Sequence, residues 1–355
     1  MGNKETIKKM NIVFIPDKSN NPYIKNTIAC LKSSRNTVYS KKEIKKASVF
    51  LAVKIIHFNW IENLDTSSVV RHYFSFLKKT CILLFLKIFR KKIIWTMHNK
   101  ISHKHKNHLL DLLMMKICIV LSNKIIIHSN MSKQILAVYH KNINGCKIFY
   151  IPHGNYLPDI KYYNIKNPDN KIVFLFFGLI KPYKNIEILI EIFNNQDTFT
   201  GINYELMITG TSVSNEYISR LNHLIKKNIK LQHEFLSDDA LNDLIQKSDI
   251  VVLPFDITSS LNSGSIMLSF SNKRTVISPS IGTLDDINKD FYYSYDYTNQ
   301  EEHKTALTHI ILKAVNDYKN NNNIFNKKGE EAYLYVKKHN NWDLIKKKML
   351  DVYND

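Results

Sequence analysis

The sequence predicts an α/β protein built from two Rossmann-like, doubly wound domains that face a cleft. Short, uniformly apolar runs alternate with longer segments of helical length along the 355 residues. A stretch rich in Pro, Gly, Asn and Asp interrupts this alternation once, near the middle of the chain, after which it resumes. The chain is also longer than a single hydrophobic core usually stabilises, which favours two domains.

Five apolar runs in the first half are short enough to be buried strands of a parallel sheet. They are Asn11 to Pro16, Lys54 to Phe58, Lys92 to Met97, Lys124 to His128 and Lys147 to Ile151. Ile24 to Lys32 and His108 to Leu121 are long enough for helices between them. The second half repeats the plan with Lys171 to Phe177, Tyr204 to Thr209, Ile229 to Phe235, Ile250 to Pro254 and Thr275 to Ser278.

The Pro- and Asn-rich residues 152–170 predict an interdomain linker. We therefore expect a first domain over residues 1–158 and a second over residues 159–330. Residues 331–355 carry apolar side chains at helical spacing among many lysines, which predicts closing helices that pack back toward the first domain.

The formal net charge is +19, from 50 Lys and Arg against 31 Asp and Glu. Nucleic acid, anionic lipid and phosphorylated substrates are the acidic partners that such an excess suits. We expect no nucleic acid, because the lysines are dispersed through predicted helices and no known binding module occurs. The four cysteines have no metal-ligand spacing and no Asp-x-Asp pair ends a strand, so we expect no metal, buried thiols and a cytoplasmic protein.

Two polar clusters in the second half follow predicted strands, where doubly wound domains place their sites. In the first cluster, Gly178 allows close backbone approach, and Lys181 and Lys184 offer two ammonium groups to a phosphate. In the second, Ser263, Gly264 and Ser265 precede an apolar run and predict a helix N-terminus that suits a diphosphate. The plain alternatives are a solvated loop and an ordinary helix cap.

Histidines and asparagines follow three predicted strands of the first half. His57 with Asn59, His98 with Asn99, and His153 with Gly154 each stand at or just after a strand. A single buried histidine is usually structural, but three at neighbouring strand ends favour a shared site in the cleft.

These segments together resemble a GT-B glycosyltransferase of the bacterial surface-polysaccharide group near family 4. Gly178 and Lys184 match a G-R-L-x-x-x-K-G pattern, with Leu179 where Arg is common. Residues 96–99 (TMHN) resemble the Thr-x-His motif, residues 151–155 the I-P-(H/N)-G linker motif, and residues 275–282 the P-V-(V/I)-A-x-x-x-G strand and loop.

The resemblance implies transfer of a hexose from a nucleotide-diphosphate sugar to a saccharide acceptor, without metal or other cofactor. It makes the first domain the acceptor side and the second the donor side. His98 becomes the catalytic residue. The residues implied in donor binding are Gly178, Lys181, Lys184, Ser263, Gly264, Ser265, His153 and Gly154, and those on the acceptor side are His57, Asn59 and Asn99.

The sequence departs from the family 4 pattern at one place, and this departure bears on whether the transfer retains or inverts the anomeric configuration. Members of family 4 usually carry two glutamates before the strand at residue 275, whereas residues 262–273 contain no acidic residue. Retaining and inverting transfer therefore both stay possible, as does a non-catalytic scaffold.

The segment from Arg71 to Lys92 interleaves aromatic and aliphatic residues with eight basic ones, counting His72, and has no acidic residue. It is too short and too charged to span a bilayer. It predicts a helix that lies on an anionic membrane surface, and hence a peripheral enzyme at the cytoplasmic face of the inner membrane acting on a lipid-linked acceptor. The alternative is a helix packed on the sheet with its lysines in water.

Overall fold

The computed structural model describes residues 9–18, 21–100, 108–140, 147–158, 171–195 and 199–354. Contacts divide the chain into two compact units. Unit 1 comprises Met1–Gly154 and Asn341–Asp355, and unit 2 comprises Asn155–Asn340. Part of the predicted linker, residues 159–170, lies outside the described residues.

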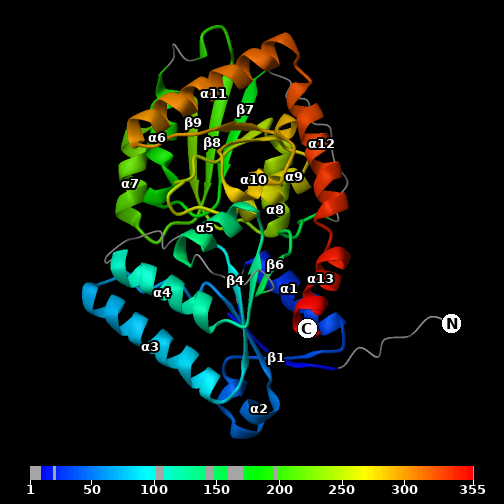
Figure 1. Ribbon diagram of the computed structural model, residues 1–355. Coiled ribbons are helices and arrows are strands. Elements are labelled where there is room, and N and C mark those ends of the chain that lie inside the picture. The colour runs from blue at the N-terminus through cyan, green and yellow to red at the C-terminus, as the bar shows by residue number, and fades with distance from the viewer. Residues whose placement is uncertain are drawn as a thin grey trace, which may run out of the picture. The chain divides into compact units, whose positions relative to one another are not determined.

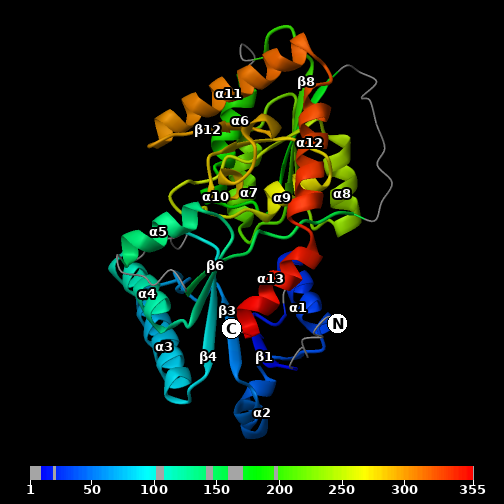
Figure 2. The same ribbon diagram turned by 45° about the vertical axis from the view of Figure 1, so that its right-hand side comes forward.

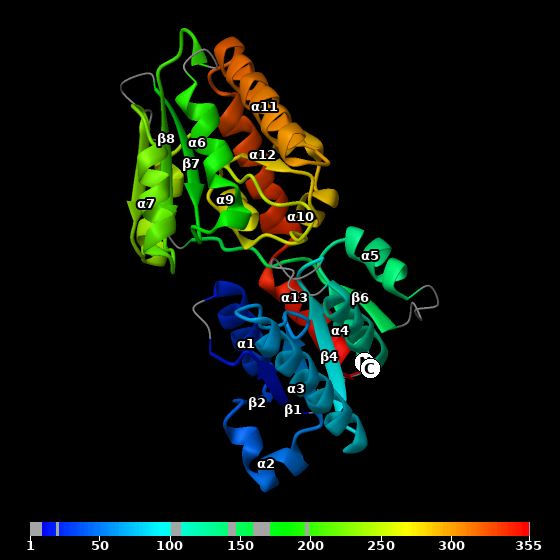
Figure 3. The same cartoon turned by 90° about the vertical axis from the view of Figure 1, so that its left-hand side faces the viewer.

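Unit 1 is a parallel sheet in the order β2-β1-β3-β4-β5-β6, with helices on both faces (Figure 1). Its strands are β1 (Asn11–Ile15), β2 (Thr37–Tyr39), β3 (Ile55–Asn59), β4 (Lys92–Met97), β5 (Lys124–Ile127) and β6 (Ile148–Tyr150). Its helices are α1 (Pro22–Ser33), α2 (Ala47–Ala52), α3 (Val69–Ile88), α4 (His108–Leu121), α5 (Met131–Tyr139) and α13 (Trp342–Asn354). Helices α1 and α13 pack together on one face, while α3, α4 and α5 cover the other (Figures 1 and 3).

The core of unit 1 lies along its central strands. All of β3 and all but the first residue of β4 are buried, as the uniformly apolar sequence predicts. Helix α13 adds Ile345, Met349 and Val352 to the core that α1 forms with β1. The last helix of the chain is therefore an integral part of the first sheet's packing.

Unit 2 repeats the architecture in the order β12-β11-β10-β7-β8-β9 (Figure 2). Its strands are β7 (Ile172–Phe177), β8 (Tyr204–Gly210), β9 (Ile229–His233), β10 (Ile250–Val252), β11 (Val276–Pro279) and β12 (Tyr293–Tyr295). Its helices are α6 (Ile186–Asn194), α7 (Asn215–Leu224), α8 (Asp238–Lys247), α9 (Gly264–Ser271), α10 (Gly282–Asp285), α11 (Gln300–Asn320) and α12 (Ile324–His339). Helices α6, α7 and α11 cover one face of the sheet, and α8, α9 and α12 the other.

The two parallel six-stranded sheets with helices on both faces confirm the predicted fold class. Two edge strands, β2 and β12, were not predicted. Each has only three residues, and β2 is half-buried throughout, so neither produces a long apolar run.

Helix α3 has an unusual outward face. Its solvent side carries a stripe of apolar residues at helical spacing, Val70, Phe74, Leu77, Leu84 and Ile88, which we call the α3 stripe. Phe74 is 68% exposed and Ile88 is 77% exposed. Cys81 lies exposed in the same row, which corrects the expectation of a buried thiol; Cys30 and Cys118 are buried, and Cys146 lies outside the described residues.

In the described part of the chain, no helix combines the length and the hydropathy needed to cross a bilayer.

Candidate functional site

A histidine stands within, or at most three residues beyond, each of four adjacent strands of unit 1. His57 is in β3, and His98, His128 and His153 follow β4, β5 and β6. All four are buried. The ring of Tyr23, on α1, lies 5.1 Å from that of His98, 5.3 Å from that of His128 and 5.2 Å from that of His153, centroid to centroid. Unit 1 thus gathers an aromatic cluster at the carboxyl edge of its sheet.

His98 is held in a defined orientation. Its Nε2 lies 2.9 Å from Oδ1 of Asn59, whose Nδ2 in turn donates to the carbonyl of Ile15. Because the amide nitrogen of Asn59 faces a carbonyl, Oδ1 must accept, and His98 carries its proton on Nε2. The ring stacks on Trp60 with centroids 4.2 Å apart. Burial, aided by the neighbouring histidines, holds the pKa of His98 well below its ordinary value.

The neutral state limits what His98 can do. A buried imidazole with a depressed pKa is a poor cation, and because its Nε2–H donates to Asn59, Nδ1 is the atom that can accept a hydrogen bond from a hydroxyl group. This chemistry suits orientation of a sugar hydroxyl or removal of its proton in the transition state.

The segment that carries His98 is anchored by Glu62, a residue that the sequence did not single out. Its carboxylate accepts a hydrogen bond from Nε1 of Trp95 at 2.9 Å and another from the backbone N–H of His98. Burial raises the pKa of Glu62 to about 7. Only tertiary burial distinguishes this glutamate from a solvated one, so the sequence offered no signal.

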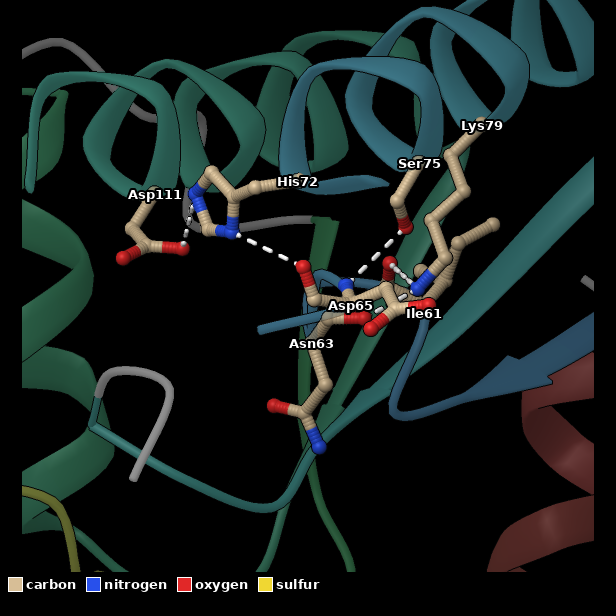
Figure 4. Close-up of polar contacts among 7 residues, drawn as sticks. All are labelled: Ile61, Asn63, Asp65, His72, Ser75, Lys79 and Asp111. Atoms are coloured by element: carbon tan, nitrogen blue, oxygen red, sulfur yellow. Dashed lines mark hydrogen bonds and ion pairs between the residues drawn. The ribbon is translucent and has the colours of Figure 1, made fainter. Parts of the chain in front are cut away.

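The loop that carries Glu62 is fastened to α3 and α4 (Figure 4). The ammonium of Lys79 donates to the carbonyls of Ile61 and Asn63, on either side of Glu62. The backbone N–H of Asp65 donates to Oγ of Ser75 at 3.1 Å.

Nearer the start of α3, His72 contacts both the loop after β3 and Asp111 of α4 (Figure 4). Its Nδ1 lies 3.2 Å from the carbonyl of Asp65, and its Nε2 lies 3.5 Å from Oδ1 of Asp111. Helices α3 and α4 therefore hold the loop after β3 in place by polar contacts, and through Glu62 they position His98.

The remaining predicted residues of unit 1 are placed differently. His57 has both ring nitrogens engaged, one by the hydroxyl of Tyr353 and one by Oγ1 of Thr96 at 2.6 Å, and this geometry fits a structural role. A Cβ on Gly154 would lie 2.3 Å from the ring of Trp342, so packing requires this glycine.

His153 and Asn99 are buried near the same edge of the sheet, and Nδ1 of His153 lies 3.0 Å from the carbonyl of Gly154. His128 was not among the predicted residues. Its Nδ1 donates to the carbonyl of Ile151 at 2.7 Å, and its place directly after a strand was the available signal.

In unit 2, the loops after β7 and β10 come together. Gly178 follows β7 with φ of 124°, a conformation that favours glycine. The nearest atom to a Cβ on Gly178 would be Oγ of Ser265, at 3.8 Å. Asn185 Nδ2 donates to the carbonyl of Pro254 at 2.9 Å and ties the two loops together.

Lys184 projects into this junction. Its ammonium lies 4.2 Å from the ring centroid of Phe255, just after β10. Burial lowers the pKa of Lys184 to about 8, and the like charge of Lys181 adds to the effect. Among the residues that the structure describes, no carboxylate forms an ion pair with Lys184. A half-buried cation without an anionic neighbour is suited to an anionic ligand.

A helix begins at Gly264, as predicted. Ser263 is its N-cap, and the Oγ of Ser263 accepts from the N–H of Ile266 at 3.3 Å. The first-turn amides of a helix have no acceptor within the helix, and they attract phosphate. Gly178 thus lies close to Ser265, Lys184 contacts the loop after β10, and Ser263 and Gly264 belong to the same helix start as Ser265.

The part of the chain that matches a known protein family is the part that contains the loops after β7 and β10. Residues 163–332 match the family described as Glycosyl transferases group 1. No curated protein matches the chain in sequence.

Solved structures share the fold over nearly the whole chain. A glycosyltransferase from Rickettsia africae ESF-5 is 18% identical, with a TM-score of 0.66, and the match covers 98% of each chain. Anabaena Alr3699/HepE in complex with UDP is 11% identical, with a TM-score of 0.67, over 98% of this chain and 100% of that one. WaaG, a glycosyltransferase involved in lipopolysaccharide biosynthesis, is 10% identical, with a TM-score of 0.59, over 96% of this chain and 99% of that one.

The chain has the fold of solved glycosyltransferases over nearly its whole length, and residues 163–332 match the glycosyl transferases group 1 family. The matched residues lie within the second unit and include Gly178, Lys184 and Ser265.

Proposed function

We propose that the protein transfers a hexose from a nucleotide-diphosphate sugar to a saccharide acceptor and that unit 2 binds the donor diphosphate. The observation that carries this proposal is the half-buried ammonium of Lys184, without a described anionic partner, at the loop after β10 that leads to the helix start at Gly264. A solved structure of similar fold, Anabaena Alr3699/HepE, is in complex with UDP, which supports a uridine nucleotide as the first to test.

In the proposed reaction, charge develops on the diphosphate as the sugar leaves. Lys184, with Lys181 nearby, and the first-turn amides of α9 stabilise this charge where it forms, so the reaction needs no divalent cation. His98 contacts the transferred sugar or the acceptor hydroxyl through its imidazole, held neutral and oriented by Asn59, Trp60 and Glu62.

The acceptor that we propose is a lipid-linked saccharide of bacterial surface-polysaccharide synthesis, met at the cytoplasmic face of the membrane. The α3 stripe supports this part of the proposal, because a contiguous exposed apolar surface marks an interaction site. The excess of basic residues favours an anionic membrane as the partner. WaaG, which has a similar fold, acts in lipopolysaccharide biosynthesis.

Ligand-dependent stabilisation and transfer test the proposal together. A panel of nucleotides and nucleotide sugars is added to the purified protein in EDTA, and the melting temperature is followed, because a ligand that binds the folded state raises it. We expect one nucleotide sugar to stabilise the protein and to be turned over in EDTA. Stabilisation by none of them, or turnover only after a divalent cation is added, would contradict the proposal.

A further inference from the structure

Residues 253–263 join β10 to α9 without regular secondary structure, and they include Phe255, whose ring lies against the ammonium of Lys184. An irregular segment keeps one conformation where other parts of the protein satisfy its backbone groups. At its far end, the N–H of Ser263 donates to Oγ1 of Thr283 at 2.7 Å, which fixes the entry to α9. Since the ammonium of Lys184 contacts the ring of Phe255, whatever fixes Phe255 also bears on where this ammonium lies.

The hydroxyl of Tyr297 fixes the backbone on both sides of Asp256. It donates to the carbonyl of Phe255 at 2.8 Å and accepts a hydrogen bond from the N–H of Ile257 at 3.0 Å. Tyr297 is buried, so water competes little for these bonds. One hydroxyl group thus uses its proton and a lone pair on two backbone groups of a segment that has no helix or strand to satisfy them.

The carboxylate of Asp256 is turned onto its own loop. It accepts hydrogen bonds from the N–H of Thr258 at 3.0 Å and from the hydroxyls of Thr258 and Ser259, each at 2.8 Å. The Tyr297 hydroxyl holds the residue before Asp256 and the residue after it. It therefore also fixes the backbone from which this negative charge extends.

The ring of Tyr297 has a rigid support of its own. Tyr297 follows β12, which packs against α11 (Figure 2). Its ring stacks on that of His303, in α11, with centroids 4.0 Å apart and an interplanar angle of 2°. His303 is fully buried, and its Nε2 lies 2.9 Å from the hydroxyl of Tyr295 in β12. The hydroxyl of Tyr297 thus reaches the loop after β10 from a side chain that packing holds in one orientation.

We propose that Tyr297 is a positioning residue of the donor site: its hydroxyl fixes Phe255, and Phe255 fixes the ammonium of Lys184 for the donor diphosphate. The inference rests on the proposed function, which assigns the diphosphate to Lys184, and adds a residue that acts through another. The alternative is a tyrosine that stabilises unit 2 without any effect on Lys184. Two measurements distinguish these roles.

A pair of matched variants serves both measurements. Tyr297→Phe removes the hydroxyl and keeps the ring that stacks on His303. Tyr204→Phe is the control, because Tyr204 is also buried and its hydroxyl also donates to a backbone carbonyl, that of Phe193, at 3.1 Å. Tyr204 begins β8, whereas the loop with Lys184 follows the end of the neighbouring strand β7. Each variant removes a buried bond between a hydroxyl and a carbonyl, so both should lower the midpoint of denaturation similarly.

The first measurement follows Lys184 in the protein without donor. Protons near the face of an aromatic ring are shifted upfield, so the ε-methylene signal of Lys184 should stand apart in NMR spectra of protein labelled with ¹³C at the lysine ε carbon. The absence of this signal from Lys184→Met assigns it. We expect Tyr297→Phe to move the signal toward those of exposed lysines and Tyr204→Phe to leave it in place. An unchanged signal in Tyr297→Phe would overturn the positioning role.

The second measurement is titration calorimetry with the nucleotide sugar that stabilises the protein most in the panel described above. We expect Tyr297→Phe to bind it about fivefold more weakly than the unaltered protein does, and Tyr204→Phe to bind it equally well. In the Lys184→Met background, Tyr297→Phe should cause no further loss, because it acts through that ammonium.

Equal losses from Tyr297→Phe in both backgrounds, equal losses for Tyr297→Phe and Tyr204→Phe, or no loss at all, would overturn the role in donor binding. Binding of no nucleotide sugar by the unaltered protein would overturn the proposed function, and with it that role. The lysine signal would still decide whether Tyr297 holds Lys184 in place, so the two failures are distinguishable.

Discussion

A Cβ atom on Gly210 would lie 1.7 Å from the carbonyl oxygen of Gly178. Gly210 ends β8, Gly178 follows the neighbouring strand β7, and their φ values are 150° and 124°. The backbones of the two strands can approach this closely only because Gly210 has no side chain. The contact fixes the start of the loop that leads to Lys184.

Gly210→Ala should therefore destabilise the protein by roughly 2 to 4 kcal/mol, since it combines an unfavourable φ with a collision against backbone. Gly201→Ala is the control, because Gly201 also has a positive φ, of 73°, but a Cβ there meets nothing within 4 Å. We expect it to cost about 1 kcal/mol. Chemical denaturation measures both, and equal losses would show that the close approach to Gly178 does not matter.

His98→Gln should lower turnover at least about a hundredfold while the melting temperature changes little. The amide of glutamine can still donate to Asn59, but it cannot accept a proton. His57→Gln serves as the comparison, because His57 is held by Tyr353 and Thr96 in the core. We expect that variant to lose stability and to keep its turnover per folded molecule. The reverse pattern would remove His98 from the reaction.

Acid should destabilise unit 1. Burial lowers the pKa of His57 and His128 to about 3 and of His153 to about 4, from 6.5. Below pH 6.5 the unfolded chain therefore binds protons that the folded chain does not, and stability falls as pH decreases toward 4.

Each such histidine contributes about 1.4 kcal/mol of loss per pH unit in that window. Glu62 opposes them with a raised pKa of about 7, but it is a single group. Denaturation at pH 7 and pH 5.5 measures the difference. A protein equally stable at both values would contradict the buried, neutral histidines.

The α3 stripe should govern attachment to membranes. Leu77→Ser removes one exposed apolar side chain from the middle of the stripe and should weaken binding to anionic vesicles by about 1 kcal/mol or more. Val138→Ser on α5 is the control, because Val138 is also highly exposed but lies outside the stripe. Vesicle binding that depends equally on Leu77 and Val138, or that does not weaken with added salt, would contradict the proposal.

The central strands could be predicted from the sequence because each is buried on both faces and leaves an unbroken apolar run, as in β7 with six buried residues. The edge strands could not, because β2 is half-buried and only three residues long. The positions of His98 and Lys184 in loops that follow strands could be predicted because their strands leave clear apolar runs; that these residues form a site stays a prediction.

Other members of the candidate site depend on tertiary contacts. Glu62 is distinguished only by burial against Trp95 and by its bond to the backbone of His98. Tyr23 meets the histidines from a helix that is distant in sequence. His57 stands in a strand, as a candidate site residue would, but its Nδ1 is hydrogen-bonded to the hydroxyl of Tyr353 in the last helix. A contact between residues so far apart in the chain cannot be predicted from the local sequence.

The central claim is that unit 2 binds a nucleotide sugar through the ammonium of Lys184. The most direct test is to measure the affinity of the Lys184→Met variant for the donor. Methionine keeps the apolar contact with Phe255 and removes the charge. Lys227→Met is the matched control, because Lys227 is exposed at the opposite edge of the same sheet. Titration calorimetry with the nucleotide sugar that the panel identifies should show binding weakened by about 1.5 to 3 kcal/mol for Lys184→Met, with an unchanged melting temperature and no effect of Lys227→Met. Equal donor affinity for both variants and the unaltered protein would contradict the account.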